Sequence, residues 1–196
     1  MSMALDDHHD TPDEALLIAF GNGDAGAARL LTARLLPRVL AIASRLLTGD
    51  RAEAEDVAQE AMLRLWRIAP DWRSGEAKVT TWLYRVTSNL CIDRIRRRGR
   101  SVALEAAGDP PDPHPGAAAA LLAADRSAAL DAALARLPDR QRQAVVLRHL
   151  EELANPQIAE IMEISTEAVE SLTARGRRAL AAALTARREE LGYDAE

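Results

Sequence analysis

Apolar residues recur at helical spacing through the first part of the chain, and this pattern predicts two helices there. From Asp13 to Leu47 they repeat every three or four positions. The run 21–24 (Gly-Asn-Gly-Asp) interrupts the pattern and predicts a turn, in which Asp24 caps the second helix. The second helix is expected to end at Thr48-Gly49-Asp50, where Gly49 suits the left-handed conformation that follows a last helical turn.

The same spacing predicts two more helices before residue 100, and then it stops. A third helix is expected from about Ala52 to Ile68 and a fourth from about Thr81 to Arg98, with a loop over 70–78 that contains Pro, Ser and Gly. Residues 100–116 contain four prolines and two glycines, which break regular structure and predict an extended linker.

Helical spacing resumes at Leu121 and predicts a second group of helices. Pro138 suits the first turn of a helix that continues through the apolar run 145–150. The pair Asn155-Pro156 predicts a short helix with Asn155 as its cap and Pro156 at its first position. After a turn at 163–165, Ser165 is expected to cap a last helix that extends to Leu184.

The composition supports helices and excludes several classes of site. Of the 196 residues 48% are hydrophobic, mostly Ala and Leu, and six are aromatic, which favours an all-α fold over sheets or disorder. The single Cys91 excludes a disulfide scaffold and a Cys-based zinc site, and the four His show no metal-ligand spacing. We also find neither a membrane-length apolar run nor a basic leader. We therefore expect an intracellular, all-α protein with no metal and no cofactor.

The charges are unevenly distributed along the chain. The formal net charge is -5, yet residues 85–100 contain six Arg and one acid, and residues 175–188 contain five Arg and no acid. Local basic stripes on an acidic protein are compatible with binding nucleic acid, because phosphates respond to local charge. Arginines on solvated helix faces would give the same pattern.

The last two predicted helices have the arrangement of a helix-turn-helix, whose second helix presents its first residues to base edges in the major groove. An ordinary helical hairpin fits the same pattern. Phosphates would be held by the arginines that follow the first turns. The candidate base-reading residues are Ser165, Thr166, Glu167, Ala168, Glu170 and Ser171, and the candidate phosphate-binding residues are Arg175, Arg177 and Arg178.

Aromatic residues and arginines alternate on the fourth predicted helix, beside a polar loop. Single-stranded DNA is bound by such surfaces, because splayed bases stack or enter pockets while Arg follows the backbone. Trp82 and Tyr84 also fit a position in the core or at its edge.

The chain resembles the extracytoplasmic-function sigma factors of bacterial RNA polymerase from about Asp13 to Leu184. Residues 54–66 (Ala-Glu-Asp-Val-Ala-Gln-Glu-Ala-Met-Leu-Arg-Leu-Trp) resemble the region that binds the polymerase. Residues 81–85 (Thr-Trp-Leu-Tyr-Arg) and the helix after them resemble the helix that contacts the −10 promoter element. Residues 137–142 and 158–161 resemble parts of the domain that reads the −35 element.

The resemblance implies a domain order and a role for each segment. We expect an acidic tail over 1–12, sigma region 2 over 13–99, a Pro-rich linker over 100–120, sigma region 4 over 121–188 and a tail over 189–196. The implied core-polymerase-binding residues are Asp56, Gln59, Glu60 and Arg64, which would contact the clamp helices of the largest subunit. The implied −10 DNA-binding residues, including a loop that captures a flipped base, are Arg73, Ser74, Gly75, Glu76, Lys78, Asn89, Asp93, Arg94 and Arg97.

The implied function is an initiation factor without catalysis of its own. It would bind core RNA polymerase, direct it to promoter DNA and help to open the duplex, with region 4 reading the −35 element and touching the flap of the second-largest subunit. We further expect an anti-sigma partner, a cytoplasmic location at the nucleoid when active, no membrane insertion and no small-molecule substrate.

Two positions depart from the family pattern, and other functions fit parts of the sequence. Glu170 and Leu172 stand where many members have basic residues; Leu172 suits a core position, and Glu170 would repel phosphates unless it accepts from a cytosine amino group. A sigma-like decoy that binds only an anti-sigma factor would explain Glu170 but not the Arg clusters. A repressor that uses only the last helices would leave the aromatic–Arg helix unexplained. An enzyme fits least, since the sequence has no phosphate loop and no nucleophile with a base.

Overall fold

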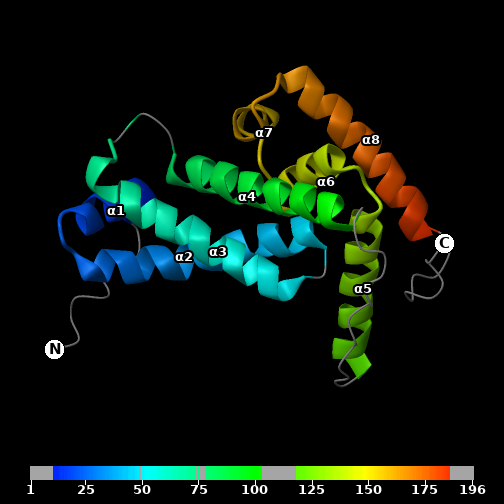
Figure 1. Ribbon diagram of the computed structural model, residues 1–196, viewed down its shortest axis with the longest axis horizontal. Coiled ribbons are helices and arrows are strands. Elements are labelled where there is room, and N and C mark those ends of the chain that lie inside the picture. The colour runs from blue at the N-terminus through cyan, green and yellow to red at the C-terminus, as the bar shows by residue number, and fades with distance from the viewer. Residues whose placement is uncertain (1–10, 49, 74, 76–77, 103–117, 186–196) are drawn as a thin grey trace.

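The computed structural model describes residues 11–48, 50–73, 75, 78–102 and 118–185, and every regular element within these ranges is helical (Figure 1). This confirms the all-α class. Residues 1–10, most of the expected linker (103–117) and the end of the chain from residue 186 lie outside the described part.

Within the described residues, four helices and a 3-10 turn form the first half, and four helices and a π turn form the second. The elements are α1 (Asp13–Gly21), α2 (Ala25–Leu47), α3 (Arg51–Ile68) with a 3-10 turn η1 (Ala69–Asp71), α4 (Val79–Val102), α5 (Ala118–Ala135), α6 (Asp139–Val145) continued by a π turn η2 (Val146–Leu150), α7 (Asn155–Met162) and α8 (Thr166–Thr185). Thus α4 extends four residues beyond the expected end at Arg98 and enters the segment expected to be linker.

Some of the predicted helix caps are confirmed. The carboxylate of Asp24 accepts from the N–H groups of Gly26 (2.8 Å) and Ala27 (3.3 Å), and the hydroxyl of Ser165 accepts from that of Ala168 (3.2 Å). After α2 the residue Thr48 adopts the left-handed conformation (φ 44°), while Gly49, to which the sequence pattern assigned this role, lies outside the described residues.

Two proline positions differ from the prediction by one residue. Pro138 precedes α6 as its N-cap residue, and α7 is capped at Ala154, which puts Asn155 and not Pro156 at the first helical position. The physical reason at α7 is that other groups satisfy this helix end. The N–H of Ala154 donates to the side chain of Gln157 (3.0 Å), while the amide of Asn155 donates to Glu170 (3.4 Å).

Helices α1 to α4 pack around a leucine-rich core. Fully buried side chains come from all four helices, including Leu16, Leu31, Leu65 and Leu83. The helix α3 begins at its N-cap Asp50, whose carboxylate accepts from the N–H of Glu53 (2.9 Å). Its apolar side faces this core and its polar side faces outward.

A second core joins the two halves of the molecule. Buried Ile42 and Leu46 from α2 belong to the same apolar cluster as buried Leu147 and Ile158 from η2 and α7. Helix α7 packs directly on α4, and α5 and α6 reach the end of α2, as Figure 1 shows. The two helical groups expected as separate domains therefore lie in contact.

Arg142 connects the halves through a buried guanidinium that is 7% exposed. Its Nη1 donates to the carbonyl of Leu46 in the last turn of α2 (2.6 Å), and its Nη2 donates to the carbonyl of Leu137 (3.2 Å) and to Asp139 (3.0 Å). Burial lowers the pKa of this guanidinium, but an arginine still keeps its charge in a protein. Because a helix end leaves its last carbonyls unpaired, Arg142 supplies α2 with a donor from the other half.

We expect Arg142→Met to lower the free energy of unfolding by about 2–4 kcal/mol, because it leaves the buried Leu46 carbonyl without its donor. Urea denaturation measures this change. Arg140→Met is the matched control, since exposed Arg140 donates to the Met162 carbonyl (3.1 Å) within its own half. Equal losses in the two variants would contradict the role given to Arg142.

Candidate polymerase and nucleic-acid interface

The four predicted polymerase-binding residues share one groove between α3 and α4 with three of the predicted −10 DNA-binding residues, Asp93, Arg94 and Arg97, whereas Asn89 and the described loop residues do not line it. On α3, positions 56, 59, 60, 63 and 64 lie on the side opposite buried Val57, Ala61 and Leu65. On α4, positions 90, 93, 94 and 97 form the facing wall. The groove is lined by Asp56, Gln59, Glu60, Leu63 and Arg64 from α3 and by Leu90, Asp93, Arg94 and Arg97 from α4.

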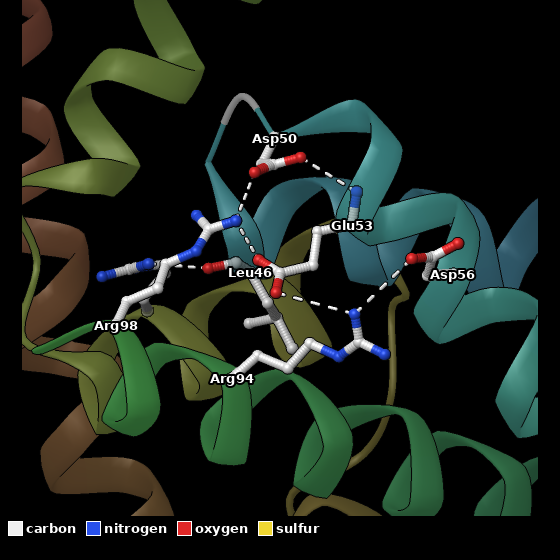
Figure 2. A network of polar contacts seen from close by, with 7 residues as sticks. Leu46, Asp50, Glu53, Asp56, Arg94 and Arg98 are labelled. Atoms are coloured by element: carbon white, nitrogen blue, oxygen red, sulfur yellow. Dashed lines mark hydrogen bonds and ion pairs between the residues drawn. The ribbon is translucent and has the colours of Figure 1, made fainter. Parts of the chain in front are cut away.

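An ion-pair network closes one end of this groove (Figure 2). Nη1 of Arg94 lies 3.6 Å from Glu53 Oε1 and 3.9 Å from Asp56 Oδ2. Arg98 pairs with Asp50 and Glu53. The hydrogen bond from the N–H of Glu53, followed by the bond and charge of Arg98, lowers the pKa of the Asp50 carboxyl. The first turn of α3 thus holds two arginines of α4.

The sequence analysis did not identify Glu53, Asp50 or Arg98 as part of the site. Asp50 was assigned only to the end of a helix, and Arg98 was one member of an arginine cluster. The i,i+4 spacing of Arg94 and Arg98 places them on one side of α4, but only the crossing of α3 and α4 shows which carboxylates they meet.

The other α3 residues on the groove wall are exposed or half-buried. Arg64 donates to Glu60 (2.8 Å), and this hydrogen bond, before the charge of Arg64, lowers the pKa of the Glu60 carboxyl. Leu63 is 42% exposed and adds an apolar side chain to this wall. The wall therefore combines acids, an arginine and an apolar contact.

The loop between α3 and α4 begins at Trp72, whose ring packs edge-on against Trp82 with centroids 6.3 Å apart. Arg73, Gly75 and Lys78 are exposed, whereas Ser74 and Glu76 lie outside the described residues. Gly75 has φ +93°, a conformation that side chains rarely adopt, so glycine is required there. The N–H of Val79 donates to Glu14 (3.2 Å), which ties the start of α4 to α1.

Helix α4 presents different faces to the groove and to the second half of the molecule. Asn89 and Asp93 are exposed on the groove side, while Tyr84 and Cys91 are buried, as expected for core positions. Tyr84 borders a polar crevice formed with Arg38 and residues 150–153, and Arg85 lies 3.8 Å from Glu163. Trp82 is half-buried and packs against the core of the first half.

The helices α7 and α8 form the expected helix-turn-helix arrangement, with Glu163 in the left-handed conformation between them. The structure leaves Ser165, Glu167, Glu170, Ser171, Arg175, Arg177 and Arg178 exposed, with Thr166 and Ala168 half-buried. Glu170 accepts from Asn155 (3.4 Å), and Arg175 donates to the hydroxyl of Ser171 (3.0 Å). Leu172 packs against the core, which explains why an apolar residue occupies this position where many family members have a basic one.

The described residues contain no cluster of three His, Cys, Asp or Glu side chains that could hold a metal ion. Among the helices in those ranges, none has the length and apolar character needed to cross a membrane.

Two family models match the chain in order. Residues 31–101 match Sigma-70 region 2, and this match contains the α3–α4 groove. Residues 127–180 match Sigma-70 region 4, and this match contains α7 and most of α8. The sigma factor SigW of Bacillus subtilis is 34% identical over 149 residues (67% of this chain and 75% of SigW). SigM of Mycobacterium tuberculosis is 33% identical over 181 residues (88% of this chain and 85% of SigM). Both are ECF RNA polymerase sigma factors.

Two solved structures share the fold over most of both chains. CnrH, in complex with the cytosolic domain of CnrY, superposes with a TM-score of 0.65 at 25% identity and covers 89% of this chain and 97% of its own. The Bartonella quintana sigma factor RpoE, in complex with the anti-sigma factor NepR, gives a TM-score of 0.66 at 22% identity over 80% of this chain and 96% of its own.

We expect Cys91 of the folded protein to resist iodoacetamide at pH 7.5. The side chain is fully buried, and burial raises the pKa of its thiol to about 12, so the reactive thiolate is scarce at that pH. Mass spectrometry before and after addition of urea measures the alkylation. Ala128→Cys supplies a control thiol at an exposed position of α5. Labelling of both thiols at one rate in the folded protein would contradict the prediction.

Proposed function

The chain belongs to the extracytoplasmic-function sigma factors of bacterial RNA polymerase, and we propose that its α3–α4 groove contacts both the polymerase and the −10 element while α8 reads the −35 element. Members of this family initiate transcription as non-catalytic subunits of RNA polymerase. The observation that carries the proposal is the groove itself, because residues assigned to two different ligands form its two walls.

The α3 wall is proposed to dock on the clamp helices of the largest polymerase subunit. Its residues Asp56, Gln59, Glu60 and Arg64 offer paired charges and an amide around the exposed Leu63. Such a mixture suits a protein interface, where a small apolar centre is surrounded by a polar rim.

The α4 wall and the loop before it are proposed to hold the −10 element. Asn89, Asp93, Arg94 and Arg97 would line the DNA path, and the segment from Arg73 to Lys78 would capture a base that has left the duplex. Flipping a base costs a few kcal/mol, which contacts to the base and to the backbone must offset. The exposed Arg73 and Lys78 provide positive charge on either side of the loop.

Helix α8 is proposed to enter the major groove at the −35 element. Its first turns would meet base edges, and Arg175, Arg177 and Arg178 would contact phosphates. The ionised carboxylate of Glu170 can accept hydrogen bonds but cannot donate them. It lies on the exposed first part of the helix, where it accepts a hydrogen bond from the side-chain amide of Asn155. A cytosine amino group is the base-edge donor that suits it. Region 4 would also touch the polymerase flap.

The two halves must separate before both elements can be read at once. By their names the elements lie about 25 base pairs apart, which at about 3.4 Å per base pair is ~85 Å of duplex. In this structure α7 packs directly on α4. We therefore infer that this packed form is the free protein and that the polymerase binds an opened one.

An anti-sigma partner is proposed on the basis of the structural neighbours. CnrH was solved with the cytosolic domain of CnrY and RpoE with the anti-sigma factor NepR. We propose that a protein of this kind holds the present chain inactive in the bacterial cytoplasm, and that the released chain acts at the nucleoid.

Run-off transcription with core polymerase on a library of genomic upstream fragments tests the function. We expect specific transcripts, from fragments that share −35 and −10 elements.

In this assay Arg97→Ala should reduce promoter opening about tenfold and lower the salt dependence by about one phosphate contact. Arg51→Ala is the control, because exposed Arg51 pairs only with the neighbouring Glu55 in the described residues. Equal activity of the two variants would exclude Arg97 from the DNA path, and a wild-type chain without transcripts would contradict the function.

A further inference from the structure

Arg94, a proposed DNA-contacting residue, is already paired with two carboxylates in this structure. Its guanidinium lies between Glu53 (3.6 Å) and Asp56 (3.9 Å), and its side chain is only 26% exposed. Figure 2 shows that both acids approach it from α3, across the groove. A DNA phosphate that contacts Arg94 must therefore compete with these carboxylates.

Glu53 is well placed to be an effective competitor. Its side chain is 21% exposed, its backbone N–H is held by the Asp50 carboxylate, and Arg98 pairs with its second oxygen. Partial burial weakens the screening of such a pair by salt, and a fixed backbone reduces the entropy lost when the pair forms. Glu53 thus neutralises two arginines of the helix proposed to contact the −10 element.

Asp56 connects this network to the other proposed ligand. Its side chain is 70% exposed and lies on the α3 wall proposed to bind the polymerase. A protein that engages the Asp56 carboxylate takes away one of the two partners of Arg94. The remaining partner, Glu53, is shared with Arg98.

We propose that Glu53 and Asp56 keep Arg94 from DNA in the free protein, and that docking of the polymerase on Asp56 releases Arg94 to a backbone phosphate. This inference rests on the proposed function of the groove. Since coupling between two binding sites is reciprocal, contact of DNA with Arg94 also frees Asp56 and strengthens polymerase binding. Glu53 then determines how far −10 capture depends on the polymerase.

The test measures the fluorescence anisotropy of a labelled 12-nucleotide DNA single strand, with the full-length chain alone and with its complex with core polymerase. In the free chain we expect Glu53→Gln to raise the affinity about fivefold, the scale of one exposed ion pair, and to steepen the dependence of log K on log salt by about 0.7 for each freed arginine. In the free chain Asp56→Asn should also raise the affinity for DNA, but by a smaller factor, because Asp56 lies farther from Arg94 than Glu53 does. In the holoenzyme the polymerase already engages Asp56, so the gain from Asp56→Asn should disappear there.

Matched variants separate this coupling from a general gain in positive charge. Glu55→Gln removes the same charge from the same helix but from the exposed pair with Arg51, and it should leave the affinity unchanged. The gain from Glu53→Gln should vanish when Arg94→Gln is added. Urea denaturation checks that each variant is folded. If Glu53→Gln does not fold, the affinity of Asp56→Asn for DNA tests the proposal instead.

Three results would overturn the proposal, and they differ in what else they overturn. Equal affinity of Glu53→Gln and Glu55→Gln in the free chain would show that Glu53 does not compete with phosphate. A gain from Asp56→Asn in the free chain that persists in the holoenzyme would remove the coupling and leave the proposed function intact. A wild-type chain that does not co-elute with core polymerase would overturn the proposed function together with the coupling.

Discussion

At the corner between α2 and α3, side chains from distant parts of the chain supply the polar partners that the ends of these helices need. The arrangement of the helices depends on these contacts. The last turn of α2 receives the guanidinium of Arg142 from the second half, through the carbonyl of Leu46. Four residues later Asp50 caps α3 and also pairs with Arg98 near the end of α4. Unpaired groups at helix termini are costly when they are buried, so each of these contacts has a reason that is independent of function. Together they fix the position of region 4, the start of α3 and the end of α4 at one place.

Helix α4 ends at this corner, and its two faces have different surroundings. One face lines the groove with α3 and stays open to a ligand. The other carries Tyr84 and Cys91 and is covered where region 4 packs on the helix. The same helix therefore participates in the proposed DNA contact and in the closure of the molecule. A change in the packing of region 4 alters the environment of α4 without touching the groove.

Local signals in the sequence were sufficient for most of the fold, and non-local contacts account for what they missed. Helical periodicity located the helices, and Asp24 and Ser165 were identified as caps because their partners lie two or three residues away. The cap of α7 was misplaced because Asn155 finds Glu170, fifteen residues further along the chain. The ion pairs of Glu53 and the buried contact of Arg142 with Leu46 join residues that are 41 to 96 positions apart, and no spacing rule predicts such pairs. Family resemblance supplied the proposed ligands of the groove, but only the structure shows that residues assigned to two of these ligands line the same groove.

The apolar cluster shared by the two halves has a consequence for the lifetime of the protein in the cell. Buried Ile42 and Leu46 of the first half share this cluster with buried Leu147 and Ile158 of the second, so separation of the halves removes part of its cover. Opened chains expose this surface, which favours self-association and gives proteases access to segments that the packed form protects. A reserve of the closed protein is consequently durable, whereas an opened chain that finds no polymerase is the form most readily degraded. The packing between the halves would thus limit how long an opened chain that has not bound polymerase persists in the cell.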